Sequence, residues 1–256
     1  MLFDTHAHLD DKRFDDDREA LIEHIHAHGM DFLVNVGAKL KGAQDSVALA
    51  RKYDFIYAAV GVHPHYADGM SERDIDTLRA LSAEDKVVAI GEIGLDYYYD
   101  NSDRDAQRRW FARQLELAKE VGLPVIIHNR DAHQDCLDIL REHKIGDIGG
   151  VMHCFSGSVE IAQQVIDMGM HISFAGPITF KNSAKLPDVV RAMPLDRIFI
   201  ETDCPYLTPE PHRGERNNPG YVLHVAQKIA EILGMPAEEL AEITKQNAIR
   251  FFGIEE

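Results

Sequence analysis

Short apolar runs alternate with longer amphipathic stretches along the whole chain. The runs are rich in β-branched and aromatic residues, and they cover residues 2–3, 32–36, 55–60, 87–90, 125–127, 150–152, 172–175 and 198–200. Nearly continuous apolar character is typical of parallel strands that are buried on both faces. The carboxyl ends of the runs follow one another about every 28 residues, close to the roughly 31 residues that one strand–helix unit of an eight-unit barrel needs.

The stretches between these runs have the spacing of amphipathic helices. Between residues 103 and 121, apolar side chains recur at positions 111, 115, 118 and 121, and Gly122 ends the predicted helix. Pro236 begins a final helix. We therefore expect an α/β fold, a single (β/α)8 TIM barrel over residues 1–256, with its active site at the C-terminal face of the strands. An open, doubly wound sheet is the alternative, because periodicity alone does not show closure.

Composition and charge narrow the range of partners. The chain has 256 residues, of which 45% are hydrophobic, an ordinary composition for a globular protein. Lys and Arg total 27 against 43 Asp and Glu, so the net charge is −16 at pH 7. Such a surface repels polyanions, which argues against a broad basic track for nucleic acid or for an anionic membrane. A small local pocket for phosphate is compatible with this charge.

Cysteine usage and the first residues predict a cytoplasmic protein. The three cysteines, Cys136, Cys154 and Cys204, are odd in number and have no C-x-x-C spacing, so a reducing compartment is expected. The N-terminus has neither the basic start nor the apolar core of a signal peptide. No stretch approaches the roughly 18 consecutive apolar residues of a membrane span. The oligomeric state is left open, and a monomer is compatible with the sequence.

Side chains that can bind metal follow five of the eight apolar runs. Alternate residues of an extended strand share a face, so His6 and His8 project together after the first run. Parallel barrel strands end at the same mouth, where side chains from distant parts of the chain converge. The predicted set is His6, His8, Glu92, His128, His153 and Asp203. These ligands suffice for two divalent ions, with Glu92 able to bridge them. Asp4 and Glu201 share faces with ligands and are expected to orient imidazole N–H groups or waters.

The motifs around these residues resemble those of the TatD family of hydrolases, within the amidohydrolase superfamily of metal-dependent barrels. They read FDTHAHL from Phe3, GVHPH from Gly61, GEIGLD from Gly91, IHNR from Ile127, HCFSG from His153 and ETDCPYL from Glu201, with Arg213-Gly214, Asn217 and Pro219 further on. The resemblance extends from the first residues to the C-terminal helix. It implies a deoxyribonuclease-like activity on phosphodiester bonds of DNA.

The resemblance also implies how the ligands are shared. The first metal would be held by His6, His8 and Asp203, the second by His128 and His153, and both by Glu92. A plain carboxylate at position 92, where many relatives carry a carboxylated lysine, separates the chain from dihydroorotase-like and phosphotriesterase-like branches. Water between two cations becomes a nucleophile near neutral pH, and Asp203 is expected to take its proton. The mixed nitrogen and oxygen ligands suit Zn, Mn, Ni or Mg.

A second set of residues is expected to bind the substrate. His63 and His65 follow the third run as His-Pro-His, and the resemblance implies that His63 contacts a phosphate or a leaving oxygen. Lys181 and Arg213 lie on predicted loops after the seventh and eighth strands, where cations could clamp a phosphodiester. The resemblance adds Asn217 to this set.

The leading functional prediction is a metal-dependent, exonuclease-like deoxyribonuclease that acts on DNA ends or short single-stranded nucleic acid. Two alternatives stay open. The same activated water would serve another ester, such as that of an aminoacyl-tRNA, or the protein could be a non-enzymatic, metal-dependent binding protein. Arg130 is expected to pair with a nearby carboxylate. The three consecutive tyrosines at residues 97–99 either stack on a nucleobase or pack as a lid.

Overall fold

Within residues 1–255, which the computed structural model describes, eight parallel strands pair in the order of the chain. They are β1 Leu2–Ala7, β2 Met30–Val36, β3 Ile56–Val60, β4 Val87–Asp96, β5 Val125–Arg130, β6 Gly150–Met152, β7 His171–Phe174 and β8 Ile198–Ile200. A parallel bridge joins Ala7 to Cys204, and the His8 backbone N–H donates to the Cys204 carbonyl at 2.9 Å. These bonds join the segment after β8 to β1 and nearly close a (β/α)8 barrel. The alternative of an open, doubly wound sheet is wrong, because such a sheet reverses its strand order.

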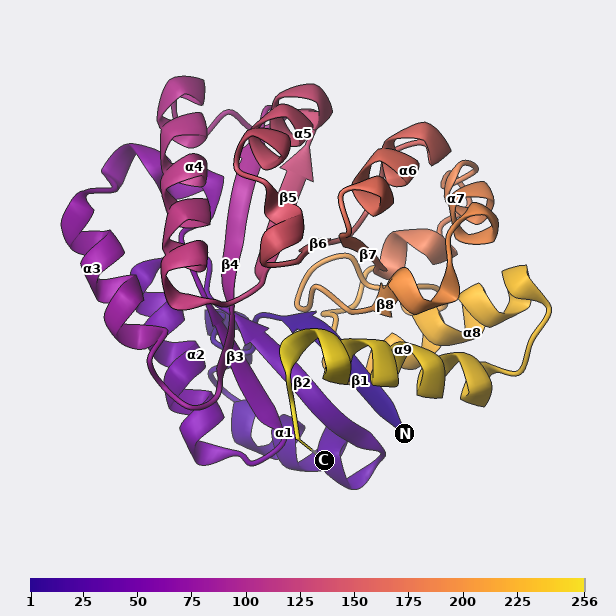
Figure 1. The fold of residues 1–256 in the computed structure, drawn as a ribbon. Helices are drawn as coiled ribbons and strands as arrows, with labels where there is room; N and C mark the ends of the chain where they lie inside the picture. Colours follow the sequence, from indigo (N-terminus) through magenta and orange to yellow (C-terminus); the bar gives the residue numbers. More distant parts are fainter. Residues whose placement is uncertain (256) are drawn as a thin grey trace.

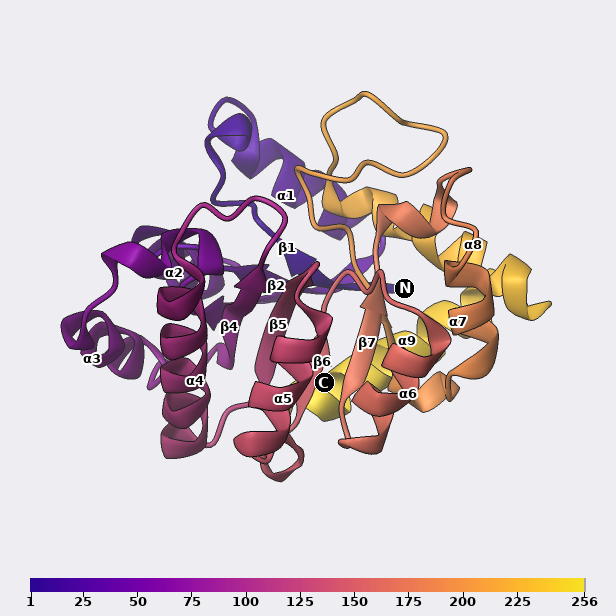
Figure 2. The same cartoon turned by 90° about the horizontal axis from the view of Figure 1, so that it is seen from above.

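Nine α-helices of residues 1–255 connect and surround the strands (Figure 1). They are α1 Arg18–Ala27, α2 Leu40–Lys52, α3 Glu72–Leu81, α4 Arg104–Val121, α5 His133–Glu142, α6 Val159–Asp167, α7 Leu186–Ala192, α8 Val222–Leu233 and α9 Ala237–Phe252. Seen from above, α4, α5 and α6 form a row outside β4, β5 and β7 (Figure 2). In this described part of the chain, no helix combines the length and the apolar character needed to cross a membrane.

The helix predicted over residues 103–121 is confirmed as α4. The Asp103 side chain caps it by accepting hydrogen bonds from the backbone N–H groups of Asp105 and Ala106. Gly122 ends the helix in the left-handed conformation, with a φ of 72°, which glycine adopts without steric cost. The final helix, α9, follows Pro236 as expected.

Two strands run further than the apolar runs that begin them. The apolar runs end at residues 3 and 90, and the strands themselves are expected to end near residues 8 and 92. β1 ends at Ala7, close to that expectation, whereas β4 continues to Asp96. The added positions include buried polar side chains: Asp4 and His6 are 0% exposed and Glu92 is 3% exposed. Hydropathy does not register polar groups that are buried against one another, so the apolar pattern stops before the strands do. The extensions bring these side chains to the barrel mouth.

Helix α9 closes the end of the barrel where the strands begin. It packs against β1 and β8, and the Phe252 ring lies 6.1 Å from that of Phe3 and 6.2 Å from that of Phe199. Ile254, which follows the helix, shares a surface hollow with Tyr57 and Val87, near the starts of β3 and β4. With this end sealed by apolar packing, the opposite mouth is left for the polar side chains.

Candidate metal centre

Glu92 lies at the middle of the barrel mouth, and its two carboxylate oxygens face different side chains. Oε1 lies 2.8 Å from His128 Nδ1 and 2.7 Å from His153 Nε2. Oε2 lies 3.6 Å from His6 Nε2 and 3.8 Å from His8 Nε2. The strands β1, β4 and β5, together with the residues directly after β1 and β6, place all five side chains here. One oxygen of Glu92 thus faces one pair of histidine rings, and the other oxygen faces a second pair. A carboxylate in this position could be shared by two cations.

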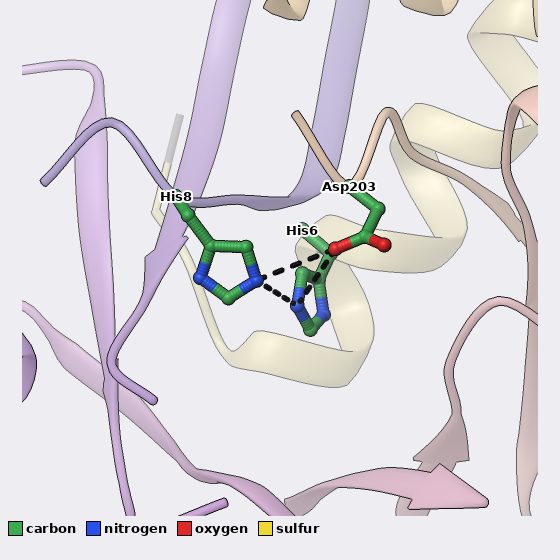
Figure 3. A group of neighbouring side chains, drawn as sticks. All are labelled: His6, His8 and Asp203. Atoms are coloured by element: carbon green, nitrogen blue, oxygen red, sulfur yellow. Dashed lines mark hydrogen bonds and ion pairs between the residues drawn. The ribbon is translucent and has the colours of Figure 1, made fainter. Parts of the chain in front are cut away.

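The first group consists of His6, His8 and Asp203 (Figure 3). The two Nε2 atoms of His6 and His8 lie 3.2 Å apart, and Asp203 Oδ1 lies 3.3 Å from His8 Nε2 and 3.8 Å from His6 Nε2. Ligand atoms around a tetrahedral ion with bonds of about 2.0–2.1 Å lie roughly 3.4 Å apart. The spacing of this group therefore fits a divalent cation.

Hydrogen bonds decide which nitrogen of two rings faces the centre. His8 Nδ1 donates to the Val36 carbonyl at 2.7 Å, so the lone pair of the neutral ring is on Nε2, toward Glu92. His128 Nε2 donates to Asp96 Oδ2 at 3.0 Å, so the lone pair of the neutral ring is on Nδ1, 2.8 Å from Glu92 Oε1. A cation that replaces the proton on either inward nitrogen can bind its lone pair.

The second group lies on the other oxygen of Glu92. His128 Nδ1 and His153 Nε2 are 3.3 Å apart, and His63 Nε2 lies 3.7 Å from Glu92 Oε1. Close pairs of inward ring nitrogens repel one another when both carry lone pairs, unless a proton or a cation lies between them. The donor set and its spacing thus make this group, like the first, able to bind metal.

The electrostatics of the centre favour positive charge. Burial alone would raise the pKa of Glu92, but the surrounding histidines outweigh it and hold that pKa well below its usual range. Burial likewise lowers the pKa of His8, yet the hydrogen bond to Asp203 and the charges of Asp203 and Glu92 raise it to about 9. A site that keeps its carboxylates ionised and attracts protons to its rings also attracts divalent cations.

Comparison with known proteins agrees with this chemistry. The family model described as TatD related DNase matches residues 3–253 of the chain. The chain belongs to the TatD family. It is 50% identical over 254 residues to Bacillus subtilis YabD, an uncharacterized metal-dependent hydrolase, across 99% of this chain and 100% of YabD. TatD of Escherichia fergusonii, named a 3'-5' ssDNA/RNA exonuclease, is 34% identical over 259 residues, across 99% of each chain.

A solved structure gives the same fold. The crystal structure of YjjV, a TatD homolog from Escherichia coli, matches with a TM-score of 0.93 at 32% identity, over 99% of this chain and 98% of that one. The predicted family and barrel are thereby confirmed, and the chain is a metal-dependent hydrolase of the TatD family.

Glu201 and Asp4, the two other carboxylates expected near the metal-binding residues, have different surroundings. Glu201 Oε1 lies 3.3 Å from His153 Nδ1 and accepts the Cys154 N–H at 2.7 Å. Asp4 instead contacts backbone N–H groups and a hydroxyl: its Oδ1 accepts the N–H groups of His6, at 3.2 Å, and Thr202, at 2.9 Å, and its Oδ2 accepts the Thr202 hydroxyl at 2.5 Å. Glu201 is thus placed beside an imidazole as expected, whereas Asp4 ties β1 to the segment after β8.

Asp96 is a residue of this centre that the sequence reasoning missed. Its Oδ2 accepts from the rings of both His65, at 2.9 Å, and His128, at 3.0 Å. Its Oδ1 accepts the backbone N–H groups of Tyr98 and Tyr99. The available signal was its position four residues after Glu92, which puts both carboxylates on one face once β4 is known to continue.

A cleft of about 640 Å³ opens over the centre of this TatD-family chain. Both His63 and His65, expected to bind the substrate, line it. The other three expected substrate-binding residues are not among the side chains that line it. Asn217 is buried and donates to the carbonyls of Thr202 and Tyr206. Lys181 is exposed in the loop after the short helix Gly176–Thr179.

Two arginines also differ from their expected surroundings. Arg213 stacks on the Phe180 ring at 3.9 Å and donates to the Thr208 carbonyl at 3.0 Å, which holds it between its own loop and the loop after β7. Arg130 lines the cleft, but it lies over the rings of Tyr98, at 4.1 Å, and Tyr99, at 4.7 Å. Among the ion pairs of residues 1–255 none involves Arg130, so the expected carboxylate partner was wrong.

Proposed function

We propose that this protein is a phosphodiesterase with two divalent cations that removes nucleotides from the ends of single-stranded nucleic acid. The observation that carries the proposal is Glu92, whose two oxygens each face a separate group of ring nitrogens. A carboxylate shared between two cations is a recurring feature of phosphoryl-transfer sites. The name of the Escherichia fergusonii relative, a 3'-5' ssDNA/RNA exonuclease, supports the choice of substrate. The ligands suit Zn, Mn, Ni or Mg.

Bound cations would acidify a water and neutralise the negative charge that grows on phosphoryl oxygens. Asp203 is the residue that we assign to accept the proton. Its side chain is 14% exposed at the wall of the cleft, and Oδ1 faces His8, which leaves Oδ2 to accept. Burial raises its pKa, but the hydrogen bond from His8 and the charges of nearby histidines lower it overall, so the carboxylate is ionised.

The rest of the cleft supports the same activity. His63 and His65 line the cleft next to Glu92 and Asp96, where their rings would contact phosphate oxygens of a bound strand. All three cysteines are free thiols, which favours a reducing compartment such as the cytoplasm. The net charge of −16 favours a grip on one or two phosphates at a strand end over a long electrostatic track.

The test is hydrolysis of a 5'-labelled single-stranded oligonucleotide by purified protein loaded with Mg²⁺ or Mn²⁺. We expect a ladder of products shortened from the 3' end. Asp203→Asn removes the proton acceptor with little change in shape, and general-base loss lowers kcat about 100- to 10,000-fold. The matched control is Asp188→Asn, since Asp188 forms an exposed ion pair with Arg191 at 2.9 Å.

Three outcomes would contradict the proposal or part of it. Full activity in Asp203→Asn would remove the role assigned to this carboxylate. Hydrolysis of an aminoacyl-tRNA ester without cleavage of oligonucleotides would favour the deacylase alternative. Metal binding without hydrolysis of either substrate would favour a binding protein.

A further inference from the structure

Exposed aromatic side chains gather around the cleft. Within residues 1–255 the exposed large hydrophobic side chains are Met1, Tyr66, Tyr98, Tyr99, Tyr206 and Leu223. Three of these, Tyr66, Tyr99 and Tyr206, line the cleft over the metal centre. Their exposed fractions are 40%, 53% and 46%, so a large part of each ring is accessible. Exposed aromatic rings that line a cleft indicate a binding surface.

These tyrosines reach the centre from two sides. Tyr206 follows β8, and its ring centroid lies 6.1 Å from that of His8 at 79°. Tyr99 follows β4, and its ring centroid lies 5.4 Å from that of His65 at 90°. Tyr66 follows β3 and lies on the same side, 6.4 Å from His65. On each side, a single histidine ring thus lies between the tyrosines and the site where the phosphodiester would be cleaved.

A positively charged side chain also lies over each of the three tyrosine rings. Lys39 Nζ lies 4.2 Å from the centre of the Tyr66 ring, and the Arg13 guanidinium lies 4.1 Å from that of Tyr206. Arg130 lies over Tyr99 at 4.7 Å. A cation covers only one face of a ring, and it leaves positive charge beside the aromatic surface. Base stacking next to a positive charge is the combination that single-strand-binding proteins use.

We propose that Tyr206 on one side, and Tyr99 with Tyr66 on the other, stack on the two unpaired bases that flank the scissile phosphate. This inference rests on the proposed function. Stacking on a ring requires a free base face, which a single strand or a frayed end offers and an intact duplex does not. It also supplies affinity that does not depend on charge, as a protein with a net charge of −16 requires. The occupant is single-stranded nucleic acid, DNA or RNA.

The test combines tyrosine variants with abasic substrates. We would measure kcat/KM of the wild-type protein with Mn²⁺ on an intact oligonucleotide and on oligonucleotides in which the terminal or the penultimate nucleotide lacks its base. We expect each missing base to lower kcat/KM about 5- to 150-fold, the size of one stacking contact. Tyr206→Ala should lower kcat/KM on the intact strand by a similar factor and abolish the penalty at one of the two positions. Tyr99→Ala should abolish the penalty at the other position.

Control variants and a baseless substrate separate stacking from other roles. Tyr206→Phe and Tyr99→Phe keep the ring and should keep the penalties. Tyr221→Ala removes a tyrosine that is stacked on His212, outside the cleft, and should change nothing. A small chromogenic phosphodiester without bases is a control substrate. In each alanine variant of a cleft tyrosine, the ratio of kcat/KM on the oligonucleotide to kcat/KM on this substrate should fall about 5- to 150-fold. Matched DNA and RNA strands show whether the sugar matters.

The outcomes distinguish this inference from the proposed function. Abasic penalties that persist unchanged in both alanine variants would overturn the stacking inference while phosphodiester hydrolysis stands. Equal losses on the oligonucleotide and on the chromogenic substrate would also overturn it, because the tyrosines would then act on the centre. Failure of wild-type protein to hydrolyse any phosphodiester would overturn both.

Discussion

At the scale of single residues, the centre depends on hydrogen bonds that point a chosen nitrogen inward. The Val36 carbonyl sets the ring of His8, and Asp96 sets the ring of His128. Neither partner contributes an atom to the two groups around Glu92. Both nevertheless determine whether a lone pair or a proton faces that carboxylate. Substitutions beyond the metal-binding set should therefore change metal affinity.

We expect Asp96→Asn to lower metal affinity or activity about 10- to 100-fold, because an amide cannot accept from two rings and two backbone N–H groups at once. The measurements are metal content after dialysis against buffers of fixed metal concentration, and kcat on an oligonucleotide. Asp100→Asn is the matched control, since Asp100 lies four residues further on in an exposed ion pair with Arg104. Unchanged metal content and kcat in Asp96→Asn would show that Asp96 does not position His128.

A second prediction at this scale concerns acid stability. Burial against Phe199 and Phe251, together with the charges of Arg197 and Arg250, lowers the pKa of His171 to about 4. The nearby Asp196 opposes this shift. Below its usual pKa of about 6.5 the ring takes up a proton in the unfolded chain but not in the folded one. His171 therefore costs stability as the pH falls from about 6.5 to 4.

We expect His171→Phe to lose less stability than wild type between pH 7 and 4.5, by up to roughly 3 kcal/mol. Urea unfolding at both pH values gives this difference directly. The exposed His24→Phe is the control. An equal acid loss in wild type and His171→Phe would disprove the role of this ring.

At the scale of elements, the position of His128 depends on how closely β4 and β5 approach. Gly94 pairs with His128 in the sheet, and a Cβ at position 94 would lie 2.0 Å from the His128 carbonyl oxygen. The φ of Gly94 is 141°, which side-chain-bearing residues rarely adopt. This glycine allows the two strands to pair directly beside Glu92 and Asp96.

Gly94→Ala should therefore separate the strands and displace His128. We expect a loss of at least about 2 kcal/mol in the free energy of unfolding, together with lower metal content. The control is Gly69→Ala, where an added Cβ meets no atom within 4 Å. Wild-type stability and metal content in Gly94→Ala would show that β4 and β5 can adjust to a side chain here.

At the scale of the whole molecule, the negative net charge and the small number of cations at the cleft together limit the electrostatic part of nucleic-acid binding. The chain carries a net charge of −16, and the cations that lie over the cleft tyrosines are Lys39, Arg13 and Arg130. Few phosphates can be neutralised, so few counterions are released on binding. The acidic remainder of the surface repels a long polyanion.

We expect the affinity of metal-free protein for a short single strand to depend weakly on salt. With about three phosphates contacted, a plot of log affinity against log salt concentration should have a slope of about −2 or shallower. Fluorescence anisotropy measures this slope, and a long duplex should bind more weakly than the single strand. Nanomolar affinity of the metal-free protein for a long duplex would contradict this account, and so would a slope steeper than about −5.

Particular residues show which features could be predicted from the sequence. Helix α4 and the eight strands were predictable because periodicity, caps and apolar runs are local signals. The end of β1 was predicted correctly, whereas that of β4 was placed too early, near residue 92, because buried polar residues such as Glu92 interrupt the apolar pattern. Asp96 was missed for the same reason. Arg213 and Asn217 were expected to bind the substrate, and that role stays a prediction. The structure shows Arg213 on the Phe180 ring and a backbone carbonyl, and Asn217 on two carbonyls of the segment after β8.

The sequence by itself determined the kinds and order of elements, the family, and a set of imidazoles and carboxylates at strand ends. Tertiary structure alone decided that the barrel nearly closes between Ala7 and Cys204 and that the two oxygens of Glu92 face different rings. It also decided that Tyr66, Tyr99 and Tyr206 meet around one cleft. The physical reason is that hydropathy is read from neighbours along the chain, whereas ring orientation and cleft lining depend on contacts between segments far apart in sequence.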